Sequence, residues 1–124
     1  MAIVALVAAL FLSAAFNLAG TRYWREKYVL WGSPLAEEVA KTVAAVTIGA
    51  PLVTVHLLFG IAEVFWDLGA GGKVLPALSS VLLHGLLGVV TFQVWYWTGT
   101  WLAGLLAAAA GHYLWNLGLG SFRS

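Results

Sequence analysis

Long hydrophobic runs, broken by short polar or glycine-rich segments, dominate the chain. The first run covers residues 2–19 without a charged residue. About 20 apolar residues are enough for a helix to cross the hydrocarbon core of a bilayer. The segment 21–32 then combines four charged with four aromatic residues, a composition typical of the lipid headgroup region. The pattern predicts a transmembrane helix followed by a short hydrophilic loop at the interface.

A helix start is expected at residue 33. Ser33 has a typical N-cap side chain, and Pro34 occupies the first helical position, where a missing N–H costs nothing. Glu37 falls in the first turn, where a carboxylate interacts favourably with the helix dipole. Ser33 and Pro34 therefore fix where the carboxylates of this helix enter the membrane.

The next hydrophobic stretch, 35–68, is too long for one untilted span and is interrupted at residues 49–51. Either Pro51 kinks one long helix, or it starts a new helix after a tight turn. Charge decides between them, because Lys and Arg collect on the cytoplasmic side of membrane proteins. Only the turn places all of the following on one side: Arg22, Arg25, Lys27, Lys73 and Arg123. We therefore expect two helices here, with the first only about 24 Å long.

The chain is therefore expected to be an all-α membrane protein, a bundle of about five transmembrane helices in one domain, 1–124. The spans are approximately 2–19, 35–50, 51–68, 76–97 and 99–118, with the N-terminus outside. The last span is rich in Ala and Gly, which suits close helix–helix contact in lipid. Homo- or hetero-oligomers through such small-residue faces are an expected class of partner.

Composition supports the membrane class. The chain is 62% hydrophobic and 9% charged, whereas soluble domains carry about 25% charged residues. Such a chain cannot cover itself with a solvated surface, so we expect an integral membrane protein in contact with lipid. Its expected location is a prokaryotic cytoplasmic membrane. A net charge of +1 does not favour nucleic acid as a partner. The absence of cysteine excludes disulfides, thiol catalysis and cysteine-ligated zinc or iron–sulfur sites.

Polar side chains from four predicted spans reach a similar depth in the cytoplasmic half of the bilayer. Counted from the inner ends, they are Glu37 and Glu38 at about 5 Å, Glu63 at about 8 Å, His84 at about 12 Å, His112 at about 9 Å and Asn116 at about 3 Å. His56, at about 18 Å, is expected to lie apart. Because each ionisable residue in a membrane costs about 2.5–3.5 kcal/mol on insertion scales, their convergence predicts a functional polar cavity.

Each of these residues also has a purely structural interpretation. Glu37 and Glu38 could cap a helix, and Lys41 could pair with Glu38 at i, i+3. His84 and His56 could simply form hydrogen bonds between helices. Taken singly, none establishes an active site.

Together, the residues suit hydrolysis without a nucleophilic serine or cysteine. A buried carboxylate can act as general base toward water, and two histidines with an amide can polarise a carbonyl and stabilise the oxyanion. The sequence contains neither a Gly-x-Ser-x-Gly nor a His-Glu-x-x-His motif. A metal site of one glutamate and two histidines is conceivable, but the composition is not specific for one, so neither a metal nor a cofactor is predicted.

Several segments also resemble a known family. Glu37–Lys41 resembles the Glu-Glu-x-x-Lys motif of PrsW-type intramembrane proteases. His112–Asn116 resembles the His-x-x-x-Asn motif that this family shares with CAAX-processing and bacteriocin-processing proteases. His84–Gly88 and Phe59–Glu63 are similar to two further segments, and the order is kept from about residue 33 to 118. Relative to the glutamate of the family segment, Glu63 lies two residues earlier in the sequence. The chain is also shorter than typical members of the family.

The resemblance implies a glutamic intramembrane endopeptidase that acts on a membrane-anchored protein or peptide near the cytoplasmic face. By its motifs, Glu37 or Glu38 activates water, His84, His112 and Asn116 assist, and Lys41 and Glu63 support them. The same superfamily contains a non-catalytic scaffold subunit, so the fold alone does not imply activity.

A second hypothesis is a small structural subunit of a membrane complex, in one version with a histidine that ligates a haem or a chlorin. Seven Trp residues, many small residues and the short chain fit a bundle that packs against partners. A transporter or channel fragment is a weaker alternative, because no charged pathway runs along the full depth of the spans.

Overall fold

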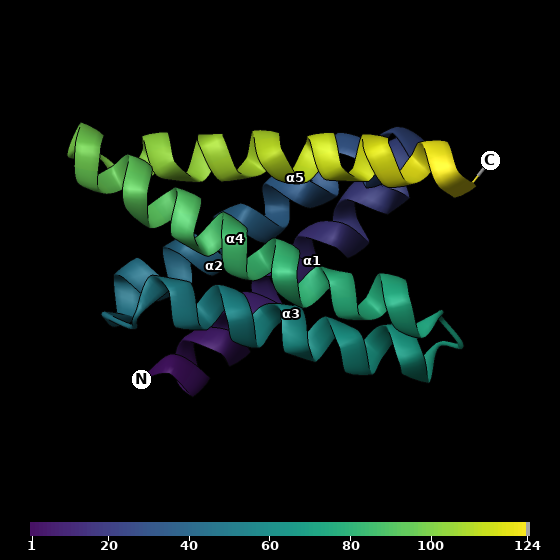
Figure 1. Ribbon diagram of the computed structural model, residues 1–124, viewed down its shortest axis with the longest axis horizontal. Helices are drawn as coiled ribbons and strands as arrows, with labels where there is room; N and C mark the ends of the chain where they lie inside the picture. Colours follow the sequence, from purple (N-terminus) through teal and green to yellow (C-terminus); the bar gives the residue numbers. More distant parts are fainter. Residues whose placement is uncertain (124) are drawn as a thin grey trace.

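Five α-helices and one short π-helical segment make up the structure (Figure 1). The computed structural model describes the backbone of residues 1–123, and their side chains except at 25–27, 29 and 119–123. The elements are α1 (Ala2–Lys27), η1 (Tyr28–Gly32), α2 (Ser33–Ile48), α3 (Leu52–Gly69), α4 (Val74–Thr98) and α5 (Trp101–Arg123). The described part contains no strand, and the predicted all-α bundle of five helices is confirmed.

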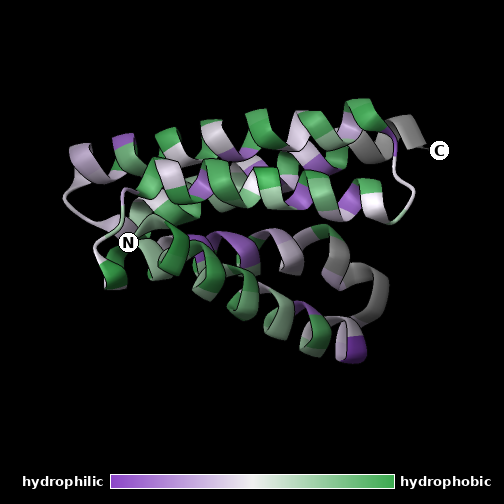
Figure 2. Cartoon of the chain, turned by 90° about the horizontal axis from the view of Figure 1, so that it is seen from below, coloured by the Kyte–Doolittle hydropathy of each residue, from purple (hydrophilic) through white to green (hydrophobic). Residues whose placement is uncertain are grey.

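Three of the described helices are long and apolar enough to cross a membrane: α1 over Ala2–Trp24, α3 and α4. Figure 2 shows hydrophobic residues along the length of the bundle, and side chains such as Phe11, Leu75 and Leu82 are exposed on its outside. This confirms the membrane class. The predicted orientation, with the N-terminus outside, stays a prediction. The orientation is inferred from five basic residues, and the side chains of three of them, Arg25, Lys27 and Arg123, lie outside the described part of the chain.

The chain reverses between α2 and α3, as the charge pattern predicts. Gly49 has φ 69°, a left-handed conformation that favours glycine. The N–H groups of Gly49 and Ala50 donate to the carbonyls of Val46 and Ala45, which closes the end of α2. Pro51 is extended and precedes α3. The stretch 35–68 is therefore two helices rather than one kinked helix.

The segment 21–32 is helical, so the predicted loop is wrong. α1 continues to Lys27, and η1 connects it to α2. Ser33 is also not the N-cap, because the backbone is already helical at Gly32 and no side chain caps α2. The Ser33 hydroxyl instead donates to Glu37 Oε1 over 2.9 Å.

Tyr28 fastens η1 to α1. Its side chain is buried, and its hydroxyl donates to the carbonyl of Phe16 over 3.0 Å. The ring lies so close to Gly20 and Gly32 that a Cβ at either position would collide with it. The aromatic residue that composition assigns to the membrane interface therefore serves as an internal packing contact.

α3 and α4 approach each other closely at two glycines. A Cβ added at Gly60 would lie 2.9 Å from Val81 Cα and 3.2 Å from His84 Cβ. A Cβ added at Gly88 would lie 2.8 Å from His56 Cβ. Each glycine thus makes room for the other helix beside a buried histidine.

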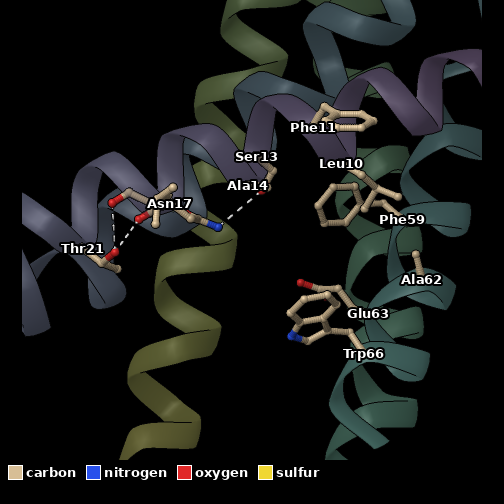
Figure 3. A pocket seen from close by; sticks show the side chains of 11 residues that line it. Leu10, Phe11, Ser13, Ala14, Asn17, Thr21, Phe59, Ala62, Glu63 and Trp66 are labelled. Carbon is tan, nitrogen blue, oxygen red and sulfur yellow. Dashed lines mark hydrogen bonds between the residues drawn. The ribbon is translucent and has the colours of Figure 1, made fainter. Parts of the chain in front are cut away.

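The apolar core joins α1, α2 and α3. Its buried members are Ala5, Ala9, Ala44, Ala45, Leu52, Val55 and Phe59. Small residues on α1 and α2 allow these helices to pack closely, as in many membrane helix pairs. Further along, α1 and α3 leave a groove between them, into which Glu63 reaches (Figure 3).

Candidate functional site

The carboxylate of Glu38 lies at the centre of a buried polar cluster. Its Oε1 accepts hydrogen bonds from Lys41 Nζ at 2.5 Å and from His112 Nδ1 at 3.0 Å. Glu38 and Lys41 are fully buried. The Lys41 ammonium also lies 4.9 Å from the centre of the Phe59 ring, a cation–π distance. Lys41 is therefore tied to Glu38, as the i, i+3 spacing predicts.

His84 extends the cluster from α2 to α3. Its Nδ1 lies 2.6 Å from Lys41 Nζ, and its Nε2 lies 2.6 Å from Glu63 Oε2. An ammonium group can only donate, so Nδ1 accepts and the protonated Nε2 donates to Glu63. Both ring nitrogens of His84 therefore have protein partners. The His84 ring also meets Phe59 and His112 edge-on, at 5.4 and 5.2 Å between ring centres.

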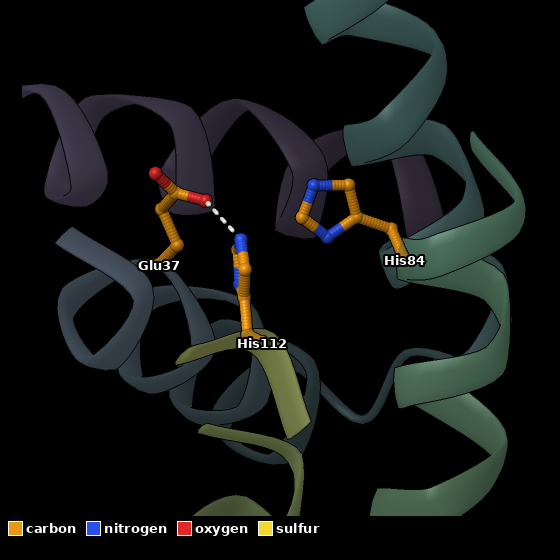
Figure 4. A group of neighbouring side chains, drawn as sticks. All are labelled: Glu37, His84 and His112. Carbon is orange, nitrogen blue, oxygen red and sulfur yellow. Dashed lines mark ion pairs between the residues drawn. The ribbon is translucent and has the colours of Figure 1, made fainter. Parts of the chain in front are cut away.

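Glu37 and His112 face each other at the edge of the cluster (Figure 4). Glu37 Oε1 accepts the bond from Ser33, and Glu37 Oε2 lies 3.8 Å from His112 Nε2. Because His112 Nδ1–H donates to Glu38, the neutral form of the imidazole carries its lone pair on Nε2. Two acceptor atoms, a carboxylate oxygen and an imidazole nitrogen, therefore face one position.

The structure brings together side chains that lie far apart in the sequence. They come from four helices: Glu37, Glu38 and Lys41 from α2, Glu63 from α3, His84 from α4 and His112 from α5. Asn116, the remaining candidate, is half-buried one turn after His112. Within the described residues its side chain makes no hydrogen bond. The predicted meeting of these glutamates and histidines is thus observed, although their roles are not tested by it.

His56 belongs to the same cluster, contrary to the sequence-based expectation. It is fully buried, and its Nδ1 lies 3.5 Å from Glu38 Oε2. Depth counted along separate helices assumes parallel axes and ignores the reach of Glu and His side chains, so the count missed this contact. Both ring nitrogens of His56 and Glu38 Oε2 lack hydrogen-bond partners, as does the buried hydroxyl of Thr42.

The unpaired nitrogens of His56 lead to a prediction about stability. A buried polar group without a partner costs about 1–3 kcal/mol. His56→Leu should therefore unfold at the same temperature as the wild type or higher, measured by thermal unfolding in detergent. His84→Leu is the matched control and should unfold at a lower temperature, because both nitrogens of His84 are bonded. If both variants lowered the unfolding temperature by the same amount, the unpaired nitrogens of His56 would not be a source of instability.

Three residues have a donor set suited to a metal ion. Glu37, His84 and His112 each offer one ligand atom within 4.8 Å of the others, and Zn²⁺ accepts such ligands. The Lys41 ammonium, however, already places a positive charge 2.6 Å from His84 Nδ1. The second His84 nitrogen is bonded to Glu63. A metal ion would have to displace one of these partners, so the contacts favour a network balanced by Lys41.

No protein-family model, curated protein or solved structure matches the chain. The fold and the cluster by themselves define the class, a helical membrane protein with a buried network of ionisable side chains. In membrane-embedded helices such residues are costly and typically functional.

Proposed function

We propose that the protein is an intramembrane endopeptidase that hydrolyses a membrane-anchored protein or peptide near the cytoplasmic face, using a water molecule activated by Glu37. The observation that carries the proposal is the opposition of Glu37 Oε2 and His112 Nε2 across 3.8 Å. Two acceptors at this spacing can share one water molecule, and each lies within reach of one of its protons.

In this mechanism, the water donates one proton toward Glu37 and the other toward His112. Its lone pairs then point away from both acceptors, toward a substrate carbonyl carbon. As the new C–O bond forms, Glu37 takes a proton from the water and the carbonyl oxygen becomes an oxyanion. The tetrahedral intermediate then collapses, the C–N bond breaks, and Glu37 returns its proton to the leaving amine.

Glu38, Lys41 and His84 would hold this arrangement in place. The Glu38 carboxylate fixes the His112 ring through Nδ1, so that Nε2 faces Glu37. Lys41 balances the charge of Glu38 and connects it to His84. His84 is then a positioning residue, because both of its nitrogens are engaged. Asn116, on the same helix face as His112, is the candidate amide donor to the oxyanion.

The motif resemblance supports the same assignment. The segments that resemble PrsW-type proteases contribute Glu37, Glu38 and Lys41 from one motif and His112 from another. Their side chains meet within one cluster. We therefore infer that the chain is a minimal relative of this superfamily, in which Glu37 is the base and Glu38 positions His112.

Substitution of Glu37 tests the proposal. Glu37→Gln should lower cleavage of co-expressed single-span membrane proteins by about 10²–10⁴-fold, the usual contribution of a general base. Asp67→Asn makes the same chemical change at an exposed position and should leave cleavage intact. A chelator should also leave cleavage unchanged. Retained cleavage in both Glu37→Gln and Glu38→Gln, or no cleavage of any reporter by the wild type, would end the proposal.

The non-catalytic alternative with a haem or a chlorin has less support. Both nitrogens of His84 and Nδ1 of His112 are bonded to protein side chains, which leaves them unavailable as ligands. The ring nitrogens of His56 are unpaired, but His56 is fully buried, so a haem or a chlorin has no open face from which to approach it. A Soret or chlorin absorbance band in the purified protein would favour that alternative.

A further inference from the structure

A groove of about 640 Å³ lies between α1 and α3, next to the polar cluster (Figure 3). Apolar side chains line most of it, among them Leu10, Phe11, Phe59 and Ala62. Its volume falls in the range of about 300–1,000 Å³ that is usual for ligand sites. In a membrane protein this groove would open sideways, toward the lipid.

One wall of the groove carries a polar stripe. Ser13, Asn17 and Thr21 follow one another at four-residue steps along α1 and therefore share a face. Asn17 Nδ2 donates to Ser13 Oγ at 3.4 Å, and the Thr21 hydroxyl donates to the carbonyl of Asn17 at 2.7 Å. Asn17 Oδ1 is buried and has no hydrogen-bond partner. The polar stripe therefore offers one acceptor atom without a partner, Asn17 Oδ1, in a groove whose other lining is mostly apolar.

The opposite wall connects the groove to the polar cluster. Figure 3 shows Glu63 and Trp66 of α3 facing the α1 side chains across the groove. The Glu63 side chain is 31% exposed, whereas its partner His84 is 1% exposed. Glu63 Oε2 is bonded to His84 Nε2, and His84 lies beside Glu37 and His112. The groove therefore borders the polar cluster at Glu63, and two side chains, Glu63 and the buried His84, separate it from the Glu37–His112 edge.

We propose that this groove receives an extended segment of the substrate, that is, an unwound stretch of a membrane helix, with a main-chain N–H donating to Asn17 Oδ1. This inference rests on the proposed function. Four helical residues rise about 6 Å, and two residues of an extended chain span about 6.6–6.8 Å. The polar groups of α1 therefore repeat at nearly the spacing of successive same-side N–H groups in an extended peptide.

A lipid tail fits this groove less well. An acyl chain has no donor for Asn17 Oδ1 and would leave it unpaired inside an apolar site, a costly arrangement. A second groove, of about 680 Å³ between α4 and α5, provides the comparison. It is lined by hydrophobic side chains and glycines, such as Leu86, Ala107 and Gly111, and so suits lipid.

Kinetics on a cleaved single-span reporter, reconstituted with the whole chain, test the proposal. Asn17→Leu should raise KM about tenfold with little change in kcat, because a ground-state hydrogen bond is lost. Ala62→Phe should raise KM by filling the groove, and Ala107→Phe in the second groove should not. If Asn17→Leu and Ala62→Phe both leave KM unchanged while Glu37→Gln abolishes cleavage, the docking proposal is wrong and the proposed function stands.

A binding readout separates substrate from lipid. A photoreactive residue at Ala62, in the inactive Glu37→Gln variant, should crosslink to the reporter peptide in vesicles of unlabelled phosphatidylcholine. The same residue at Ala107 should crosslink to lipid. Crosslinks to lipid alone at Ala62 would overturn the proposal, even if cleavage by the wild type is confirmed.

Discussion

Lys41→Met should lower the free energy of unfolding by about 3–5 kcal/mol, because it leaves the buried carboxylate of Glu38 without its cation. Lys41 and Glu38 are fully buried, and their contact at 2.5 Å is the shortest of those that Glu38 makes with its neighbours. The His112 bond would remain, but a neutral imidazole does not balance the charge. Unfolding of the purified protein, titrated with denaturing detergent, provides the measurement.

Two further variants show whether the loss comes from the charge. Lys73→Met removes a cation at an exposed position of the α3–α4 connection and should have little effect. The double variant Lys41→Met, Glu38→Gln should recover most of the lost stability, because no uncompensated charge remains. If the double variant is as unstable as Lys41→Met alone, the loss comes from packing rather than charge.

A methyl group at Gly88 is expected to push α3 and α4 apart. The added Cβ would lie 2.8 Å from His56 Cβ and 3.2 Å from Val53 Cα. Neither atom is at the end of a flexible side chain, so the helices must separate. Overpacking of this kind costs about 1–3 kcal/mol, and Gly88→Ala should lower the unfolding temperature accordingly.

Gly118→Ala makes the same change at an open position of a neighbouring helix. Outside the backbone of its own helix, no atom of the side chains that the structure describes lies within 4 Å of the added Cβ, and alanine is favoured over glycine within helices by about 1 kcal/mol. This variant should therefore keep or raise the unfolding temperature. A lower unfolding temperature for Gly88→Ala and an unchanged or higher one for Gly118→Ala would identify Gly88 as a packing contact. Equal shifts in the unfolding temperature would refute this.

The sequence alone predicts much of this fold, because the strongest constraints are local. Apolar runs, glycines and prolines define the helices, and the turn at residues 49–51 follows from Gly49 and Pro51 together with the charge pattern. The sequence also predicts that four ionisable side chains lie together, because they stand at comparable depths in their predicted spans. Ionisable side chains inside a membrane pair with one another. The four are Glu37, Glu38, His84 and His112.

Other features depend on tertiary contacts that no local pattern encodes. The Tyr28 side chain orders the segment expected to be a loop, because its ring packs on Gly20 and Gly32. Helical backbone at Gly32 then leaves the Ser33 hydroxyl free to bind Glu37 rather than cap α2. The contact of His56 with Glu38 depends on how two helices lie against each other.

The shortness of α2 links this network to the thickness of the surrounding lipid. With 16 residues, α2 rises about 24 Å, whereas the hydrocarbon core measures about 30 Å. Local thinning of the bilayer is one way in which a membrane accommodates such a mismatch. If α2 crosses the bilayer, local thinning would bring the water boundary toward the end that carries Glu37, and lipids with longer tails would move that boundary away from the carboxylate.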